Sequence, residues 1–390
     1  MRKFSAHRIY PVNSPPISFG IVETDDDGTI RNIRSTGGKP VEEAGLEFYP
    51  GIIIPGMVNT HCHLEVSHLK GQIPEHTGIS GFVSSLQKLR QIEPERIIQA
   101  AAEADRVMYL QGISAVGDIS NLEITLPIKK ISRIRYHTFI EIYGFDPVVS
   151  AARFQHGLHL AKLFSEAGLP HTLSPHAPYS VGEEMWNLLA GASSLTGRIS
   201  MHHNESPEER ALLENGEGRL ADSFRLAGFD ISHLPAEAPD AFALLGKYLP
   251  ASDWILVHNT LMNSIPSPAG IKQGVYWVLC PRSNQYIENL LPDIEGFAAN
   301  GLTVCLGTDS LASNHSLSIL DEMKVILDSV PGVDFDTVLR WATINGAHAL
   351  DMQNQLGSIE TGKRPGLVNI PVFDWTKNRL GQASQPVRLI

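Results

Sequence analysis

Two histidines, His61 and His63, stand two residues apart at the end of an apolar run that begins at Gly51. Side chains alternate between faces along an extended strand, so both imidazoles point to one side while Cys62 points to the other. Imidazoles are common ligands of divalent metals, and two on one face make half of a metal site. Further groups of this kind end other apolar runs: His202-His203-Asn204-Glu205, Val257-His258-Asn259 and Gly307-Thr308-Asp309-Ser310. Together they predict a hydrolytic metalloenzyme.

A catalytic metal site uses three or more nitrogen or oxygen ligands and keeps one position open for water. The chain offers four such ligands from three strand ends: His61, His63, His202 and Asp309. A bound divalent metal lowers the pKa of water to about 7, and Glu205 and His258 are then candidates for moving protons. One divalent ion is expected. Zinc is favoured, with iron and manganese as alternatives, because three histidines and one aspartate suit all three metals.

Each of these residues also has a purely structural interpretation. The histidines can be hydrogen-bonded groups of a buried strand end, and Asp309 can cap a following helix. Glu205 can belong to the helix start at Ser206-Pro207. The recurrence of such residues at successive strand ends favours the metal interpretation. A non-catalytic barrel stabilised by metal is a further alternative, but a structural zinc site would more often be closed by cysteines.

Composition narrows the class of protein. The 390 residues are 43% hydrophobic with 33 glycines and 25 prolines, which is typical of a turn-rich α/β protein with one large domain and a smaller unit. A net charge of -11 without a long basic run argues against nucleic acid or a membrane as the partner. The chain begins without an apolar signal core, and its three cysteines cannot pair completely. We therefore expect a cytoplasmic protein with reduced thiols that acts on a small molecule.

Eight short apolar runs have the character of buried parallel strands, and helix-like amphipathic sequence fills most gaps, as at residues 94–110 and 151–167. The runs are residues 52–63, 114–119, 134–142, 172–175, 198–202, 254–258, 275–280 and 303–306. This alternation predicts a closed (β/α)8 TIM-type barrel, whose active site lies at the carboxyl ends of the strands. A doubly wound open sheet is the alternative, but the glycine-rich phosphate turn that it would need after the first strand is missing.

The two ends of the chain differ from the middle. Short β-type runs separated by turn residues occupy residues 1–52 and 356–390, and we expect them to form one small composite β-sandwich. Residues 53–355 would then be the metal-dependent catalytic barrel. Two connections are long, residues 64–112 and 206–253, and long connections on the active face of a barrel usually shape the substrate pocket.

The chain resembles the amidohydrolase superfamily, whose members are metal-dependent hydrolases and deaminases built on a (β/α)8 barrel with a small β-sandwich. The resemblance covers essentially the whole chain. It rests on the motifs Pro55-Gly56-Met57-Val58-Asn59-Thr60-His61-Cys62-His63, Ser174-Pro175-His176-Ala177-Pro178, His202-x-x-Glu205, His258-Asn259, Cys280-Pro281-Arg282-Ser283-Asn284, Gly307-Thr308-Asp309-Ser310, Ala342-Thr343-Ile344-Asn345-Gly346-Ala347 and Gly357-Ser358-Ile359-Glu360-x-Gly362-Lys363.

The His-x-x-Glu element and the lack of a strand lysine placed to bridge two metals resemble the one-metal deaminase branch of this superfamily. The resemblance implies that His61, His63, His202 and Asp309 bind the metal. It also implies that Glu205 protonates the ring nitrogen beside the attacked carbon, while His258 and Asp309 orient and deprotonate the water. His176 stands where the branch usually has a histidine that contacts the substrate.

Within that branch, residues 63–67 and 307–314 are similar to aminodeoxyfutalosine deaminases, which replace the 6-amino group of an adenine nucleoside in a route to menaquinone. Their substrate carries a benzoate, so a cation is expected near the pocket. Arg282 is favoured over His68 and Lys70 because its planar fork suits a carboxylate. Glu65 is a candidate acceptor for the ribose hydroxyl groups.

Several alternatives remain open from the sequence. The same scaffold also supports deamination of guanine, adenosine or S-adenosylhomocysteine, and hydrolysis of an amide, an imidazolone or a chlorotriazine. A surface salt bridge would equally explain Arg282 or Glu65, and Glu141 suits a supporting contact, a substrate contact or a rim ion pair. A homodimer is compatible with this type of barrel. Arg364-Pro365-Gly366 replaces the acidic Lys-x-Ala-Asp-Leu arrangement of many members, and we expect this departure to alter packing and not chemistry.

Overall fold

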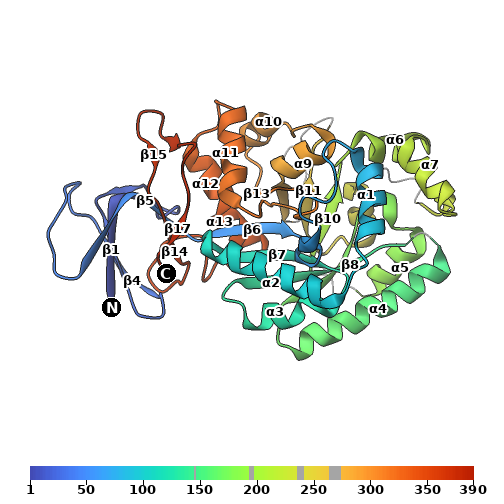
Figure 1. Ribbon diagram of the computed structural model, residues 1–390, viewed down its shortest axis with the longest axis horizontal. Coiled ribbons are helices and arrows are strands. Elements are labelled where there is room, and N and C mark those ends of the chain that lie inside the picture. Colours follow the sequence, from blue (N-terminus) through green and yellow to red (C-terminus); the bar gives the residue numbers. More distant parts are fainter. Residues whose placement is uncertain (145, 193–196, 235–240, 263–273) are drawn as a thin grey trace.

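The computed structural model describes residues 1–144, 146–192, 197–234, 241–262 and 274–390. It has two parts, a β/α barrel and a smaller sheet made by both ends of the chain (Figure 1). The sheet lies at one end of the molecule's long axis, and α1 (Gly78–Leu89), α6 (Pro207–Asn215) and α7 (Arg219–Leu226) lie at the other. No helix among the described residues is long and apolar enough to cross a membrane.

The barrel consists of two four-stranded parallel sheets, β6-β7-β8-β9 and β10-β11-β12-β13. Backbone N–H groups cross both seams: that of His202 donates to His176 O at 2.9 Å, and that of Thr308 donates to His61 O at 3.0 Å. The predicted parallel barrel is therefore confirmed. Its strands are β6 (Met57–Cys62), β7 (Ile113–Ser120), β8 (Arg135–Ile142), β9 (His171–Pro175), β10 (Arg198–His203), β11 (Asp253–His258), β12 (Val275–Leu279) and β13 (Val304–Leu306).

Helices connect the strands and cover the barrel, as α2 illustrates. It begins with Pro94 in its first turn, where proline needs no hydrogen-bond partner, and it buries Ile97, Ala101, Ala104 and Met108 at helical spacing. This helix spans Pro94–Leu110, and the other long helices of the barrel are α4 (Pro147–Glu166) and α11 (Ile319–Ser329). The shorter ones are α3 (Leu126–Ile131), α5 (Glu183–Gly191), α8 (Ala241–Tyr248), α9 (Pro281–Glu288), α10 (Ile294–Ala299), α12 (Phe335–Ala342) and α13 (Ile344–Ala349), with a 3-10 helix η1 (Leu64–Leu69) after β6.

A seven-stranded sheet joins the two ends of the chain in the order β17-β14-β5-β1-β3-β4, with β2 paired to β1. The predicted strand-rich unit from both chain ends is thus present, mainly as one sheet. Its strands are β1 (Arg2–Ile9), β2 (Ile17–Ser18), β3 (Ile21–Thr24), β4 (Ile30–Arg34), β5 (Leu46–Pro55), β14 (Leu367–Ile370) and β17 (Val387–Arg388), and a separate pair is formed by β15 (Phe373–Asp374) and β16 (Arg379–Leu380).

The apolar run at residues 52–63 is not one strand, contrary to expectation. It divides at Gly56 into β5, which pairs with β14, and β6, which pairs with β7. A Cβ at Gly56 would lie 1.9 Å from Ser114 Oγ and 2.5 Å from Pro365 O, so glycine permits the two parts to approach closely. Pro365 belongs to the departure from the family pattern, and its carbonyl accepts a 2.8 Å hydrogen bond from Ser114 Oγ at this junction.

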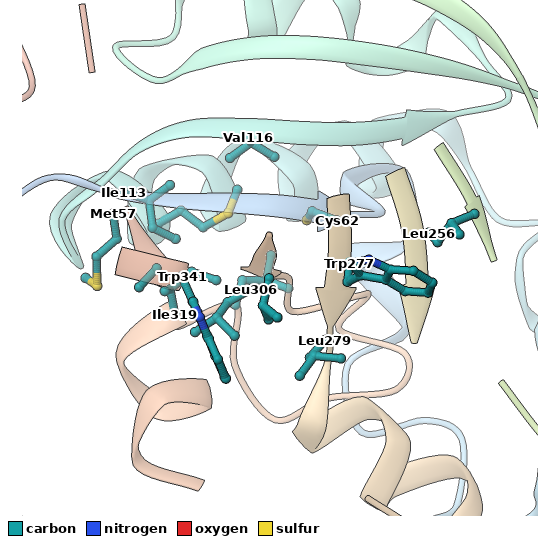
Figure 2. Close-up of a cluster of buried hydrophobic side chains, with 14 of the residues drawn as sticks. Met57, Cys62, Ile113, Val116, Leu256, Trp277, Leu279, Leu306, Ile319 and Trp341 are labelled. Atoms are coloured by element: carbon teal, nitrogen blue, oxygen red, sulfur yellow. The ribbon is translucent and has the colours of Figure 1, made fainter. Parts of the chain in front are cut away.

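The main core lies between the barrel strands and the covering helices. Figure 2 shows Ile319 of α11 and Trp341 of α12 beside Leu306 of β13, all fully or nearly fully buried. Every residue of β7 is buried, as expected for a parallel strand covered on both faces. This packing fixes the strand ends rigidly, and the polar residues of the candidate site lie at those ends.

Candidate active site

The four predicted metal ligands converge at the carboxyl ends of β6, β10 and β13. His61 Nε2 and His63 Nε2 are 3.2 Å apart, and Asp309 Oδ1 is 3.7 Å from the first and 3.4 Å from the second. The ligand atoms of His61, His63 and His202 lie within 4.8 Å of one another. This spacing fits one divalent ion held by three imidazoles and one carboxylate.

The protonation states of these ligands favour the binding of a cation between them. Burial lowers the pKa values of His61 and His202, so both imidazoles stay neutral and keep a lone pair. Burial alone would raise the pKa of Asp309, but the adjacent imidazoles outweigh it and hold that pKa well below its ordinary value. Neutral imidazoles and an ionised carboxylate are the protonation states that metal binding requires.

The backbone adopts the left-handed conformation where the site residues leave their strands. The φ angles are 48° at Asn204, 76° at His258, 57° at Asn259 and 56° at Asp309. Non-glycine residues pay about 1–3 kcal/mol each for such a conformation, and it persists only when the surroundings enforce it. Asn59 helps to enforce it beside Asp309, since it exchanges hydrogen bonds of 2.7 and 3.1 Å with the side chain and backbone of Thr308.

His202 is oriented so that only one of its nitrogens can bind a metal. Its Nδ1 lies 2.9 Å from the carbonyl oxygen of His176, to which it can only donate, so Nε2 carries the lone pair. Glu141, His176 and His202 also have ligand atoms within 4.8 Å of one another. Because the single free nitrogen of His202 can serve one ion, we assign it to the group with His61 and His63.

Two serines hold Asp309, and sequence reasoning did not single out either of them. Ser283 Oγ and Ser313 Oγ both donate to Asp309 Oδ2, each at 2.6 Å, which leaves Oδ1 facing His61 and His63. Hydroxyl groups near a strand end carry no distinctive pattern. Their only sequence signal is that both lie within motifs already noted, Cys280 to Asn284 and the residues after Asp309.

Replacing Ser313 by alanine is expected to weaken metal affinity by roughly 10- to 100-fold, because a carboxylate ligand that loses an orienting hydrogen bond binds less well. The affinity would be measured by titrating metal-free protein with zinc against a chromophoric chelator. Ser132→Ala is the matched control, since Ser132 Oγ makes an equally short 2.6 Å bond to Asp105 far from these ligands. An unchanged zinc affinity in Ser313→Ala would show that this hydrogen bond does not support the site.

Glu205 and His258 face each other next to the ligands. Glu205 Oε1 is 3.6 Å from His258 Nε2, and both side chains are almost completely buried. Burial, reinforced by Asp309 and Glu209, raises the pKa of Glu205 well above its ordinary value, and burial lowers the pKa of His258 to about 3. Asn284 Nδ2 lies 3.2 Å from His258 Nδ1, so a neutral His258 that accepts this bond carries its proton on Nε2, toward Glu205.

A cavity of about 400 Å³ opens above these groups, within the usual size of a small-molecule site. His63, His202, Glu205 and Asp309 line it, whereas His61 and His258 lie behind them. Its apolar lining includes Phe82 and Leu86 from the first long connection and Phe224 from the second. The two long connections thus shape the pocket, as their lengths predict.

Not all of the expected substrate contacts line the cavity. Glu65 and His176 line the cavity; Glu65 Oε2 accepts hydrogen bonds from the backbone N–H groups of Asn121 and Leu122 at 3.0 and 3.2 Å. Burial raises the pKa of Glu65 to about 7. His176 Nδ1 lies 2.7 Å from Ser180 Oγ, which leaves its Nε2 turned toward Glu141 Oε1 at 4.0 Å.

The cations expected near the pocket are not among its lining residues. Arg282 Nη1 forms an ion pair of 3.1 Å with Asp321 and a 3.3 Å hydrogen bond to Ser316. His68 lines a separate cavity, and Lys70 is exposed. Glu141 does line the pocket, where its Oε2 accepts from Asn121 Nδ2 at 3.1 Å.

Comparison with known proteins identifies the family. The sequence pattern that defines the amidohydrolase family matches residues 52–380 of this chain. The chain belongs to the amidohydrolase family. It is therefore a metal-dependent hydrolase, and the convergence of His61, His63 and His202 supplies the metal-binding group that this class requires.

Curated proteins similar to this chain include several deaminases. An adenosine deaminase from Helicobacter pylori is 29% identical over 328 residues, which cover 82% of this chain and 79% of that protein. An aminodeoxyfutalosine deaminase from Deinococcus radiodurans is 29% identical over 310 residues, covering 76% of this chain and 72% of that protein. The expected resemblance to this group of amidohydrolases is confirmed.

Solved structures share the fold. The crystal structure of Helicobacter pylori aminofutalosine deaminase in complex with methylthio-coformycin aligns with a TM-score of 0.81 over 100% of both chains, at 24% sequence identity. At that identity the similarity concerns the architecture, and it agrees with the barrel and terminal sheet described above.

Proposed function

We propose that the chain is a hydrolytic deaminase that converts the 6-amino group of an aminopurine nucleoside into a 6-oxo group with release of ammonia. Aminodeoxyfutalosine is the favoured substrate. The observation that carries this proposal is the position of Glu205, whose carboxyl lines the same cavity as the metal ligands and lies 3.6 Å from His258. An acid beside a metal site suits protonation of a ring nitrogen as water attacks the neighbouring carbon.

The residues would share the proton transfers in the following way. A divalent ion at the site supplies water with a pKa of about 7. Asp309 accepts the proton of the attacking water, and its Oδ2 bonds to two serines keep it oriented. Glu205 delivers a proton to the ring nitrogen, and His258 orients the water through Nε2. Asp309 then passes the proton that it took from water to the amino group, which leaves as ammonia, and the remaining hydroxyl proton returns to Glu205 as the 6-oxo group forms.

Two further contacts would position the nucleoside. Within the described part of the chain no group donates a hydrogen bond to Glu65 Oε1, so this oxygen is available to a ribose hydroxyl. His176 Nε2 carries a lone pair if Nδ1 donates to Ser180, because the serine hydroxyl itself donates to Ala177 O at 3.0 Å. We place the substrate between these groups.

The metal, the division into parts and the compartment are proposals of the same kind. Zinc suits three neutral imidazoles and a carboxylate. Residues 1–52 with 356–390 would form the smaller unit, and residues 53–355 the catalytic barrel. A reducing compartment such as the cytoplasm suits the three cysteines, Cys62, Cys280 and Cys305, which are buried and unpaired.

The substrate is tested by measuring kcat/KM of the zinc-loaded protein for ammonia release from aminodeoxyfutalosine, adenosine, S-adenosylhomocysteine, guanine and cytosine. We expect aminodeoxyfutalosine to be preferred by at least about tenfold, which corresponds to about 1.4 kcal/mol in the transition state. Preference for another of these compounds would support deamination but identify a different substrate. Turnover of a chlorotriazine or an amide without turnover of any of the five would contradict deamination.

A further inference from the structure

Two arginines line the cavity, and neither takes part in the chemistry described above. Arg90 follows α1 as its capping residue, and Arg153 lies on α4. Among the described residues that line the cavity, Arg90 and Arg153 are the ones with a lysine or arginine side chain. The two helices belong to different connections of the barrel, so the cations reach the same pocket from separate walls.

The sequence spacing on both helices places an apolar side chain one turn before each arginine. Phe82, Leu86 and Arg90 succeed one another at intervals of four residues and all line the cavity. Val149 and Arg153 do the same on α4. Residues four apart share a helix face, so each wall presents apolar surface followed by a cation.

Neither guanidinium forms an ion pair with a carboxylate of the described residues. Arg153 donates to Tyr143 O at 3.3 Å and stacks over the Tyr143 ring at 3.9 Å. Arg90 forms no ion pair or side-chain hydrogen bond within the described residues, and its charge acts on the Glu65 carboxyl only at longer range. Two acids of the cavity lining accept hydrogen bonds from the backbone: Asp146 from the N–H groups that begin α4, and Glu65 from those of Asn121 and Leu122. A half-buried arginine without an acidic partner favours an anionic ligand.

The distance from the metal ligands sets where such an anion would lie. Ring contacts lead outward from His202 to His176, with centroids 4.7 Å apart, and from His176 to Tyr143, 6.0 Å apart. Arg153 stacks over the Tyr143 ring, 3.9 Å from its centroid. The rings of His176 and Tyr143 thus link His202 to Arg153, an arrangement that suits a terminal group on an extended arm of the ligand.

We propose that Arg90 and Arg153 bind the carboxylate at the end of the substrate's arm, while Phe82, Leu86 and Val149 contact the apolar part of that arm. This inference rests on the proposed function for the purine end of the ligand. It assigns to these arginines the role that sequence reasoning gave to Arg282, whose guanidinium is already paired with Asp321. Selectivity would follow from charge, because a neutral arm leaves both guanidinium groups without an anionic partner.

The test measures binding, so that it does not depend on turnover. Calorimetry on the zinc-loaded protein compares the 6-oxo product of aminodeoxyfutalosine with the same compound carrying a carboxamide in place of its carboxylate. We expect the native protein to bind the acid roughly 10- to 100-fold more tightly, as hydrogen bonds to a charged group imply. Arg90→Gln and Arg153→Gln should each reduce this ratio, and the double variant should bring it close to one.

Matched variants separate the possible outcomes. Arg106→Gln alters an exposed arginine of α2 paired with Glu103, and it should keep the native ratio. A native ratio near one, a ratio preserved in the double variant, or a ratio lost only in Arg282→Gln would each overturn the inference. Loss of the ratio without any ammonia release from nucleosides by the native protein would support the anion site and refute the proposed reaction. Ammonia release by a native protein that binds the acid and the carboxamide equally well would support the proposed reaction and refute the anion site.

Discussion

Glu205→Gln is expected to lower kcat for deamination by about 10²- to 10⁴-fold and to leave bound metal unchanged. Glutamine keeps the size and one hydrogen-bonding oxygen of the side chain but has no proton to give to the ring nitrogen. Glu205 lines the cavity beside the ligands, so the substitution acts on the reacting end of the pocket. Steady-state ammonia release and elemental analysis of the purified variant would measure both quantities.

Glu214→Gln provides the control for this prediction. Glu214 is exposed on α6, the helix that begins just after Glu205, so the same chemical change is made nearby but outside the cavity. It should retain the native kcat. Native activity in a folded, metal-containing Glu205→Gln protein would remove Glu205 from the proton transfer.

His63→Ala is expected to abolish turnover and most metal binding, with the zinc content falling from about one ion per chain toward zero. Water without a metal has a pKa of about 15.7, compared with about 7 when bound, so loss of the ion removes the nucleophile at neutral pH. His63 lies at the open side of the group, lining the cavity, with its Nε2 3.2 Å from His61 Nε2. Elemental analysis and ammonia release would be measured on the same preparation.

His159→Ala is the corresponding control, because His159 is exposed on the outer helix α4. It should keep both metal and activity. Circular dichroism would establish that His63→Ala remains folded, as the barrel core does not depend on this side chain. Full zinc occupancy in a folded His63→Ala protein would contradict the assignment of His63 as a ligand.

Much of the fold follows from local sequence. Seven of the eight predicted barrel strands agree with observed strands to within about a residue or two at each end, the usual ambiguity of element boundaries. The exception is the run at residues 52–63, which is uniformly apolar on both sides of Gly56. Nothing local reveals that Gly56 packs against Ser114 and Pro365, since those contacts join segments distant in sequence. Only the folded chain distinguishes two strands from one.

The site was predictable where strand periodicity controls it. His61 and His63 share a face because they are two residues apart, and His202 and Asp309 meet them because parallel strands end at the same side of a barrel. The pocket walls lack such a rule. Arg282 follows a barrel strand as the ligands do, but α9 turns its guanidinium to Asp321. Arg90 and Arg153 lie on helices of the connections, where their direction depends on tertiary packing.

Incubation of the zinc-loaded protein with aminodeoxyfutalosine in oxygen-18 water, followed by mass spectrometry and an ammonia assay, tests the central claim most directly. The account predicts a 6-oxo product that carries one labelled oxygen, formed together with an equal amount of ammonia. It also predicts that chelation stops both and that added zinc restores them. Formation of neither product nor ammonia from this compound, adenosine or S-adenosylhomocysteine, by folded protein with a full complement of metal, would contradict it.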